Sequence, residues 1–121
     1  MAARTMKEEL NLRTDSGVWA IRSAGPTLYV LDLNSRPARC LRLAGSTSPP
    51  GVTDGTWATV VDLRAVAADG TVAPETVRVG CRALWELDPG PHHPDVIWWL
   101  QRVVTSIGAA PQHIVPTRPR R

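Results

Sequence analysis

The chain has 121 residues, of which 43% are hydrophobic and 21% are charged, with a formal net charge of +3. These values are typical of one globular domain and exclude a largely disordered chain. No apolar run reaches the roughly 18 residues that a membrane-spanning helix needs. The N-terminus also lacks the apolar core of a signal peptide, so we expect a cytoplasmic protein.

The positive charge is concentrated at the C-terminal end of the chain. Residues 116–121 carry three arginines, whereas residues 14–115 carry eight arginines against nine acidic residues. A domain that follows a nucleic-acid backbone is normally basic itself. The neutral body therefore argues against nucleic-acid binding and leaves the basic tail as the electrostatic argument in its favour.

The residue usage points to the kind of genome that encodes the chain. One lysine stands against thirteen arginines, and phenylalanine is absent. The depleted residue types are those with AT-rich codons, which indicates a GC-rich bacterium or one of its viruses. The arginine excess therefore does not by itself indicate function.

The first half of the chain shows short alternating runs that are separated by turn residues. We expect residues 1–13 to form a flexible arm. Residues 17–23 and 27–33 then place apolar side chains on one face, as a strand does. Gly25-Pro26 marks the turn between them. A further turn at 34–37 and a strand at 38–43 complete a predicted meander.

Two more strands are predicted beyond a long loop at 44–55, which is rich in Ser, Pro and Gly. Residues 56–66 alternate, and one face carries Trp57, Thr59, Val61, Leu63 and Ala65. In residues 76–87 all six odd-numbered positions are apolar, which is the clearest period-two pattern in the chain. Because a twelve-residue strand is long, we expect a bend or bulge at Gly80.

Residues 95–107 fit two patterns. Their apolar residues match helical spacing, with Asp95 as a possible N-cap and Gly108 as a stop. The same run is rich in β-branched and aromatic residues, as in a strand that is buried on both faces. We favour a strand and keep the helix as the alternative. The tail, residues 111–121, is predicted to be disordered.

Together these patterns predict an all-β fold, a small barrel or sandwich of about six mostly antiparallel strands over residues 14–110. The alternative is an α+β fold with a C-terminal helix at 95–107. The Gly17-x-Trp19 start, the strand around Asp32-Leu33, Val79-Gly80 and the closing Thr105-Ser106-Ile107 resemble small β-rich proteins of unknown function from GC-rich bacteria and their viruses. The resemblance spans residues 17–107 and implies an all-β fold, but it transfers no site residues. Such sequences more often have Gly-Ser where this chain has Gly25-Pro26.

No catalytic constellation is visible in the sequence. His92-His93 precedes Pro94-Asp95, but adjacent histidines in a loop point apart, and a zinc site needs about three converging ligands. Cys40 and Cys81 lack CxxC spacing and read as buried free thiols. We therefore predict no enzyme activity, no metal and no cofactor.

The candidate binding residues are aromatic or basic. Trp98 and Trp99 are adjacent, so a strand would turn them to opposite faces. Either one of them is exposed as a binding residue, or both belong to a core on two sides of the strand. Three arginines crowd the hairpin around Pro37, and three more lie in the tail. The full set is Trp98, Trp99, Arg36, Arg39, Arg42, Arg118, Arg120 and Arg121.

We expect a non-enzymatic protein-interaction or structural module, a viral or accessory factor of a GC-rich bacterial system. Its partner would be a protein, and a homodimer that forms through an open sheet edge fits the same features. The alternative is a small β-barrel that binds single-stranded nucleic acid by tryptophan stacking and through its arginine tail.

Overall fold

The computed structural model describes residues 6–44, 55–91, 95–111 and 114. Among these residues there are eleven β-strands and no α-helix. The strands are β1 (Met6–Lys7), β2 (Glu9–Asn11), β3 (Val18–Ser23), β4 (Leu28–Asp32), β5 (Arg39–Leu43), β6 (Trp57–Val66), β7 (Val72–Pro74), β8 (Thr76–Arg78), β9 (Arg82–Asp88), β10 (Ile97–Gln101) and β11 (Val104–Ala109).

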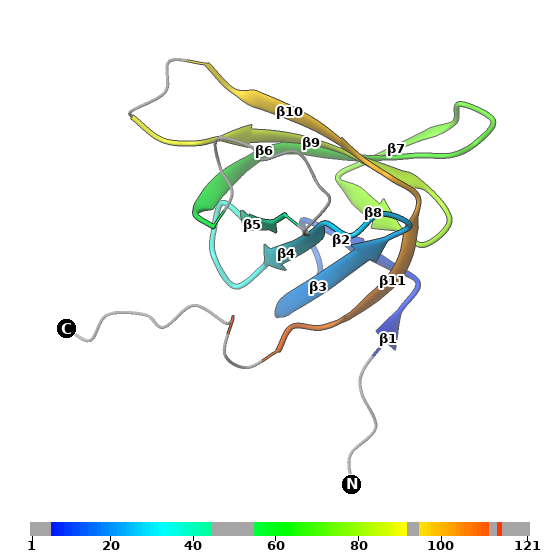
Figure 1. Cartoon of the computed structure of the whole chain (residues 1–121), viewed down its shortest axis with the longest axis horizontal. Coiled ribbons are helices and arrows are strands. Elements are labelled where there is room, and N and C mark those ends of the chain that lie inside the picture. The colour runs from blue at the N-terminus through cyan, green and yellow to red at the C-terminus, as the bar shows by residue number, and fades with distance from the viewer. Residues whose placement is uncertain (1–5, 45–54, 92–94, 112–113, 115–121) are drawn as a thin grey trace, which may run out of the picture.

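Nine of the strands form one antiparallel sheet that folds over on itself into two layers (Figure 1). Its strand order is β1-β11-β3-β4-β5-β6-β9-β10, and β7 pairs with the far end of β6. Strands β10, β9, β6 and β7 lie above β5, β4, β3 and β11, and β2 pairs with β8 in a second, two-stranded sheet. The hydrophobic core fills the space between the layers.

The sheet is not closed, because its end strands, β1 and β10, do not pair with each other. The all-β prediction and the antiparallel pairing are confirmed, whereas the expected number of about six strands is wrong. Short edge strands raise the number, and the sequence signal of a two- or three-residue strand is weak. The helix alternative for 95–107 is also wrong, since β10 and β11 occupy that segment.

Strands β3 and β4 form the meander that the turn residues predicted. Trp19 and Ile21 on β3 and Tyr29 and Leu31 on β4 are all buried, so the alternation correctly identified the inner face. Leu33, just beyond β4, is buried as well and donates its backbone N–H to the carbonyl of Gly17 at 2.8 Å.

A β-bulge reverses the alternation within β6. The register with β9 shifts between Val60 and Asp62. Before the bulge the even-numbered Ala58 and Val60 are buried, and after it Leu63 is buried instead. Val61, which the alternation assigned to the inner face, is 52% exposed. One extra residue in a strand turns the following side chains to the opposite face, which a uniform period-two pattern cannot represent.

The predicted long strand at 76–87 is divided into β8 and β9 near Gly80. Gly80 has a positive φ of 90°, a conformation that glycine adopts readily. Its N–H donates to the carbonyl of Val104 at 2.8 Å, which holds the bend against β11. Val77, Cys81 and Trp85 are nevertheless all buried, so the predicted inner face continues across the bend.

The N-terminal segment is more ordered than we expected. Residues 6–7 form β1 and residues 9–11 form β2, and Leu10 is 1% exposed within the core. The β-rich domain therefore begins before residue 14. Most of the predicted loop at 44–55 and most of the predicted tail at 111–121 lie outside the described residues.

Candidate functional site

Strand β10 forms one edge of the main sheet. In the part of the chain that the structure describes, it pairs with β9 on one side and with no strand on the other. Unpaired backbone N–H and C=O groups along an edge are a template for another strand. None of the five residues of β10, Ile97–Gln101, is charged or a proline.

The other edges of the described sheet carry features that discourage such pairing. Strand β1 has only two residues, and β7 has three and ends in Pro74. Short strands and prolines are common means of blocking an edge. Strand β10 has five residues and neither feature, so it is the most accessible of the three edges.

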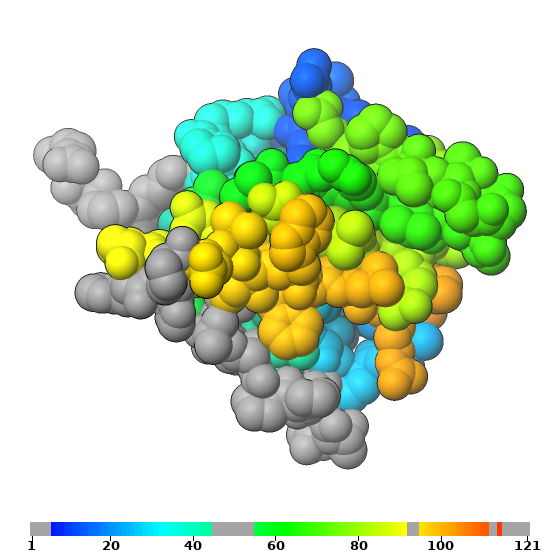
Figure 2. Space-filling model, turned by 90° about the horizontal axis from the view of Figure 1, so that it is seen from above, coloured from blue at the N-terminus to red at the C-terminus, as the bar shows by residue number. Residues whose placement is uncertain are grey.

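The outer face of β10 is apolar and exposed. Trp98 is 50% exposed and Leu100 is 47% exposed, and Val96 just before the strand is also exposed. Figure 2 looks onto this face, where β10, β9 and β6 lie side by side. The register places Trp98 opposite Glu86 of β9 and Leu100 opposite Leu84. We call Val96, Trp98 and Leu100 the β10 patch.

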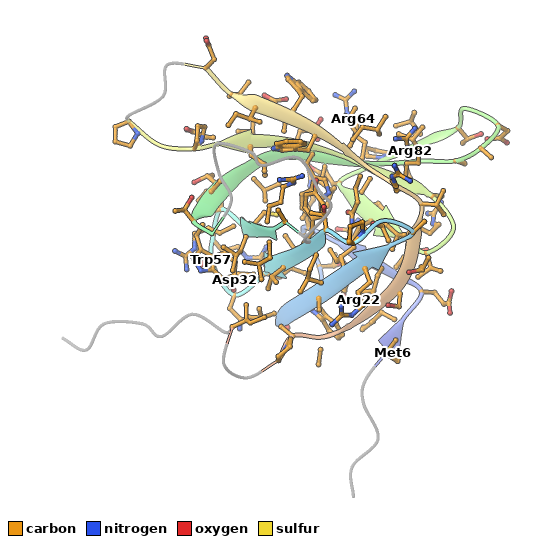
Figure 3. All side chains as sticks on the ribbon, viewed as in Figure 1. Met6, Arg22, Asp32, Trp57, Arg64 and Arg82 are labelled. Carbon is orange, nitrogen blue, oxygen red and sulfur yellow. The ribbon has the colours of Figure 1, made fainter. Side chains whose placement is uncertain are left out.

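Charged residues flank the β10 patch. Asp95 lies before β10, and Arg102 follows it. Arg64 and Arg82 lie on the upper layer (Figure 3), where Nε of Arg64 is 2.7 Å from a carboxylate oxygen of Asp62. The edge is thus acidic at its start and basic at its end.

Trp99 faces the interior, opposite to Trp98, as the strand geometry predicted. The guanidinium carbon of Arg42 lies 3.9 Å from the centroid of the Trp99 ring, a cation–π contact between the two layers. Arg42 is 4% exposed. Two of the candidate binding residues, the partly buried Trp99 and the buried Arg42, are therefore brought together against the core.

A second cross-layer contact lies beside this pair. Tyr29, opposite Arg42 in the β4–β5 register, stacks on Trp85, opposite Trp99 in the β9–β10 register. Their ring centroids are 5.2 Å apart and their planes differ by 8°. The two neighbouring contacts fix the spacing between the layers at this end of the core.

Gln101 links three strands beneath the edge. Nε1 of Trp85 donates to Oε1 of Gln101 at 3.0 Å, and Nε2 of Gln101 donates to the carbonyl oxygen of Ile21 at 3.2 Å. Gln101 is 3% exposed. The sequence analysis did not select this residue, although Gln101 directly follows the apolar run 96–100, and that isolation was an available signal.

A pocket of about 400 Å³ opens between β10 and the turn that joins β3 to β4. Its lining consists of Ser23, Ala24, Gly25, Pro26, Thr27, Tyr29, Arg42, Trp99, Leu100, Gln101 and Arg102. The lining includes Tyr29, Arg42, Trp99 and Gln101, whose contacts join the two layers of the sheet. We call this the Arg42 pocket.

The three arginines of the hairpin do not form one surface. Nη1 of Arg36 donates to the carbonyl of Leu12 at 2.7 Å. Nη2 of Arg39 lies 3.3 Å from a carboxylate oxygen of the buried Asp32, and its guanidinium lies over Trp57 at 5.4 Å. Arg42 points inward. A basic patch made of all three residues is therefore not present.

Arg39 and its partners form a compact cluster at one end of the molecule, where Figure 3 labels Asp32 and Trp57. A carboxylate oxygen of Asp32 accepts from Oγ of Ser35 at 2.9 Å, and the other accepts from the N–H of Asn34 at 2.9 Å. These bonds hold the tight connection between β4 and β5. We interpret the cluster as structural, because each contact fixes the hairpin.

Neither cysteine is suited to nucleophilic chemistry. Cys40 and Cys81 are free and buried. Burial raises the pKa of the Cys40 thiol well above its ordinary value, and the nearby charge of Arg42 opposes this only in part. The thiolate, which is the nucleophile, is therefore disfavoured at Cys40.

The described residues contain no group of three or more His, Cys, Asp or Glu side chains that could hold a metal ion. They also include no helix with the length and apolar character needed to cross a bilayer. His92 and His93 lie outside the described residues, as do Arg118, Arg120 and Arg121.

Comparison of the chain with protein-family models, with characterised proteins and with solved structures gives no significant match.

Proposed function

We propose that this protein is a non-enzymatic protein-interaction module that acts through the open edge of β10, and that the chain that binds there is a second copy. The observation that carries this proposal is the edge itself. It is the longest unprotected edge of the described sheet, and the apolar Trp98 and Leu100 stand exposed beside it.

The charges at the two ends of β10 favour self-association. In an antiparallel pair of β10 strands, the acidic start of each strand, at Asp95, approaches the basic end of the other, at Arg102. A register with Trp99 opposite its own copy also places Trp98 opposite Leu100 of the second copy. The two β10 patches then form one continuous apolar face across the interface.

The size of the contact sets the expected affinity. An edge-to-edge contact between five-residue strands is at the small end of protein interfaces, so we expect a dissociation constant of about 1–100 µM. Covering the exposed half of Trp98 removes about 100 Å² of apolar surface, which contributes about 2.5 kcal/mol in each copy. Trp98→Thr should therefore weaken the dimer by at least about 50-fold.

Sedimentation velocity of the full chain over about 1–500 µM tests the proposal. We expect a monomer–dimer equilibrium that Trp98→Thr and Leu100→Lys each shift to monomer. Val72→Thr is the matched control, because Val72 is 48% exposed on β7, away from β10. A chain that is monomeric at every concentration overturns the second copy as the occupant. A dimer that survives both β10 substitutions overturns the edge as the interface.

The nucleic-acid alternative has less support from the described residues. The exposed Trp98 would suit base stacking, but it lies opposite Glu86, whose carboxylate repels phosphates. Fluorescence anisotropy with a labelled oligothymidine gives a direct comparison. Binding that weakens steeply with salt, and again when residues 116–121 are deleted, would favour that alternative over the protein-interaction module.

A further inference from the structure

Trp98 differs from the other tryptophans of the chain, because no described residue pairs with its ring. Each of the other four tryptophans pairs with a cation or with another aromatic ring. These pairs are Lys7–Trp19, Arg39–Trp57, Arg42–Trp99 and Tyr29–Trp85. Trp98 has no such partner in the part of the chain that the structure describes, and it is 50% exposed on the outer face of β10 (Figure 2).

A carboxylate without an ion-pair partner lies beside Trp98. Glu86 of β9 is directly opposite Trp98 in the register, which places their Cβ atoms about 5 Å apart. Trp85, the preceding residue, is buried in the core, so Glu86 points to the outer face. Glu86 is partly exposed and forms no ion pair with any described residue. Arg64 of β6 is held instead by Asp62, at 2.7 Å.

The β4–β5 hairpin contains a complete form of the arrangement that Trp98 and Glu86 begin. There the guanidinium of Arg39 lies over Trp57 at 5.4 Å, and its Nη2 is 3.3 Å from a carboxylate oxygen of Asp32. One planar cation thus contacts an indole ring and a carboxylate at once. A guanidinium suits both contacts, because it stacks on an aromatic face and presents its N–H groups to carboxylate oxygens. Trp98 and Glu86 provide the ring and the carboxylate, and no described residue provides the cation.

We infer that Trp98 and Glu86 bind an arginine side chain of a partner protein, with the guanidinium stacked on the indole ring and paired with the carboxylate. Charge complementarity favours a cation at this end of β10, because Asp88 follows Glu86 on the same face of β9 and Asp95 precedes β10. The inference does not rest on self-association. Both use Trp98 and should therefore compete, but Glu86 belongs to the arginine site alone.

An NMR titration of the full ¹⁵N-labelled chain with N-acetylarginine methylamide tests this inference, at low protein concentration and constant ionic strength. We expect saturable shifts at the Trp98 indole N–H and the Glu86 amide, with a dissociation constant of about 1–20 mM, because one exposed cation–π contact and one exposed ion pair are each weak. The citrulline analogue has a similar shape without the charge and should bind at least about 5-fold more weakly. The lysine analogue lacks the planar fork and should bind at least about 2-fold more weakly.

Glu86→Gln should weaken arginine binding at least about 5-fold, since it removes the paired carboxylate. Glu8→Gln is the matched control, because it removes the same charge from an exposed position between β1 and β2, and it should leave binding unchanged. Trp98→Thr should reduce binding below detection. Glu86→Gln should keep the wild-type monomer–dimer equilibrium in sedimentation velocity, so a failure of arginine binding can be told apart from a failure of self-association.

The basic tail provides a test of where the arginine comes from. Replacing Arg118, Arg120 and Arg121 with glutamine should leave the Trp98 indole signal of the unliganded chain unchanged. A changed signal would assign the site to the chain's own tail and overturn a partner protein as the source. Absence of saturation, equal binding of the citrulline analogue, or equal weakening by Glu86→Gln and Glu8→Gln would each overturn the arginine site itself.

Discussion

Replacing Gln101 with leucine isolates the contribution of the hydrogen bonds beneath β10. Leucine preserves most of the buried volume but can neither accept from Nε1 of Trp85 nor donate to the carbonyl of Ile21. Trp85 is 0% exposed, so water cannot replace the lost acceptor. Leaving that donor without a partner, together with losing the bond to the carbonyl, should lower the free energy of unfolding by about 2–4 kcal/mol.

Urea unfolding followed by tryptophan fluorescence and circular dichroism measures this change. With an m-value of about 2 kcal/mol/M, the midpoint should fall by about 1–2 M urea. Protein concentration must be low and equal for all variants, because self-association would add apparent stability. Thr105→Val, at an exposed position of β11, is the control and should change stability by less than about 0.5 kcal/mol. If Gln101→Leu proves as stable as this control, the hydrogen-bond argument is refuted.

Three further predictions concern the remaining parts of the fold. Burial raises the pKa of the Cys40 thiol in the folded state, so the neutral thiol contributes stability below the ordinary thiol pKa of about 8.5, and this contribution is lost as the pH rises above that value. Urea titrations should therefore show a declining free energy of unfolding above this pH, and Cys40→Ala should lessen the decline. Asp32→Ala should lower the free energy of unfolding by about 2–4 kcal/mol, because it removes the buried carboxylate that contacts Asn34, Ser35 and Arg39. An unchanged thermal midpoint would contradict the structural role assigned to this carboxylate. Gly80→Ala should cost about 1–2 kcal/mol through its positive φ alone, because an added Cβ meets no atom within 4 Å, and calorimetry that finds no loss would argue against the bend between β8 and β9.

The alternation of apolar residues predicted much of the fold. It identified the inner faces of β3, β4 and β9 because those strands bury one face against a single core. It failed in β6, where the bulge at Val61 turns later side chains over, and a bulge leaves no reliable mark in one sequence. It was ambiguous at 95–107, because both faces of β10 are apolar for different reasons: Trp99 packs inward, while Trp98 remains exposed.

The sequence predicted individual residues of the candidate site but not which of them come into contact. Adjacency alone indicated that Trp98 and Trp99 face opposite ways. The contact between Trp99 and Arg42 joins residues 57 positions apart in the sequence, and only the pairing of the strands brings them together. The same is true of Gln101, whose partners Trp85 and Ile21 come from two other strands.

The most direct measurement of the proposed self-association is an isotope-filtered NOE experiment on a mixture of labelled and unlabelled wild-type chains at high concentration. The filter retains only contacts between copies. Antiparallel pairing of β10 predicts NOEs from the Trp98 indole ring of one copy to the Leu100 methyl groups of the other. NOEs between copies that involve other strands and spare Trp98 and Leu100, or none at all at a concentration of about 500 µM, would contradict the proposed interface.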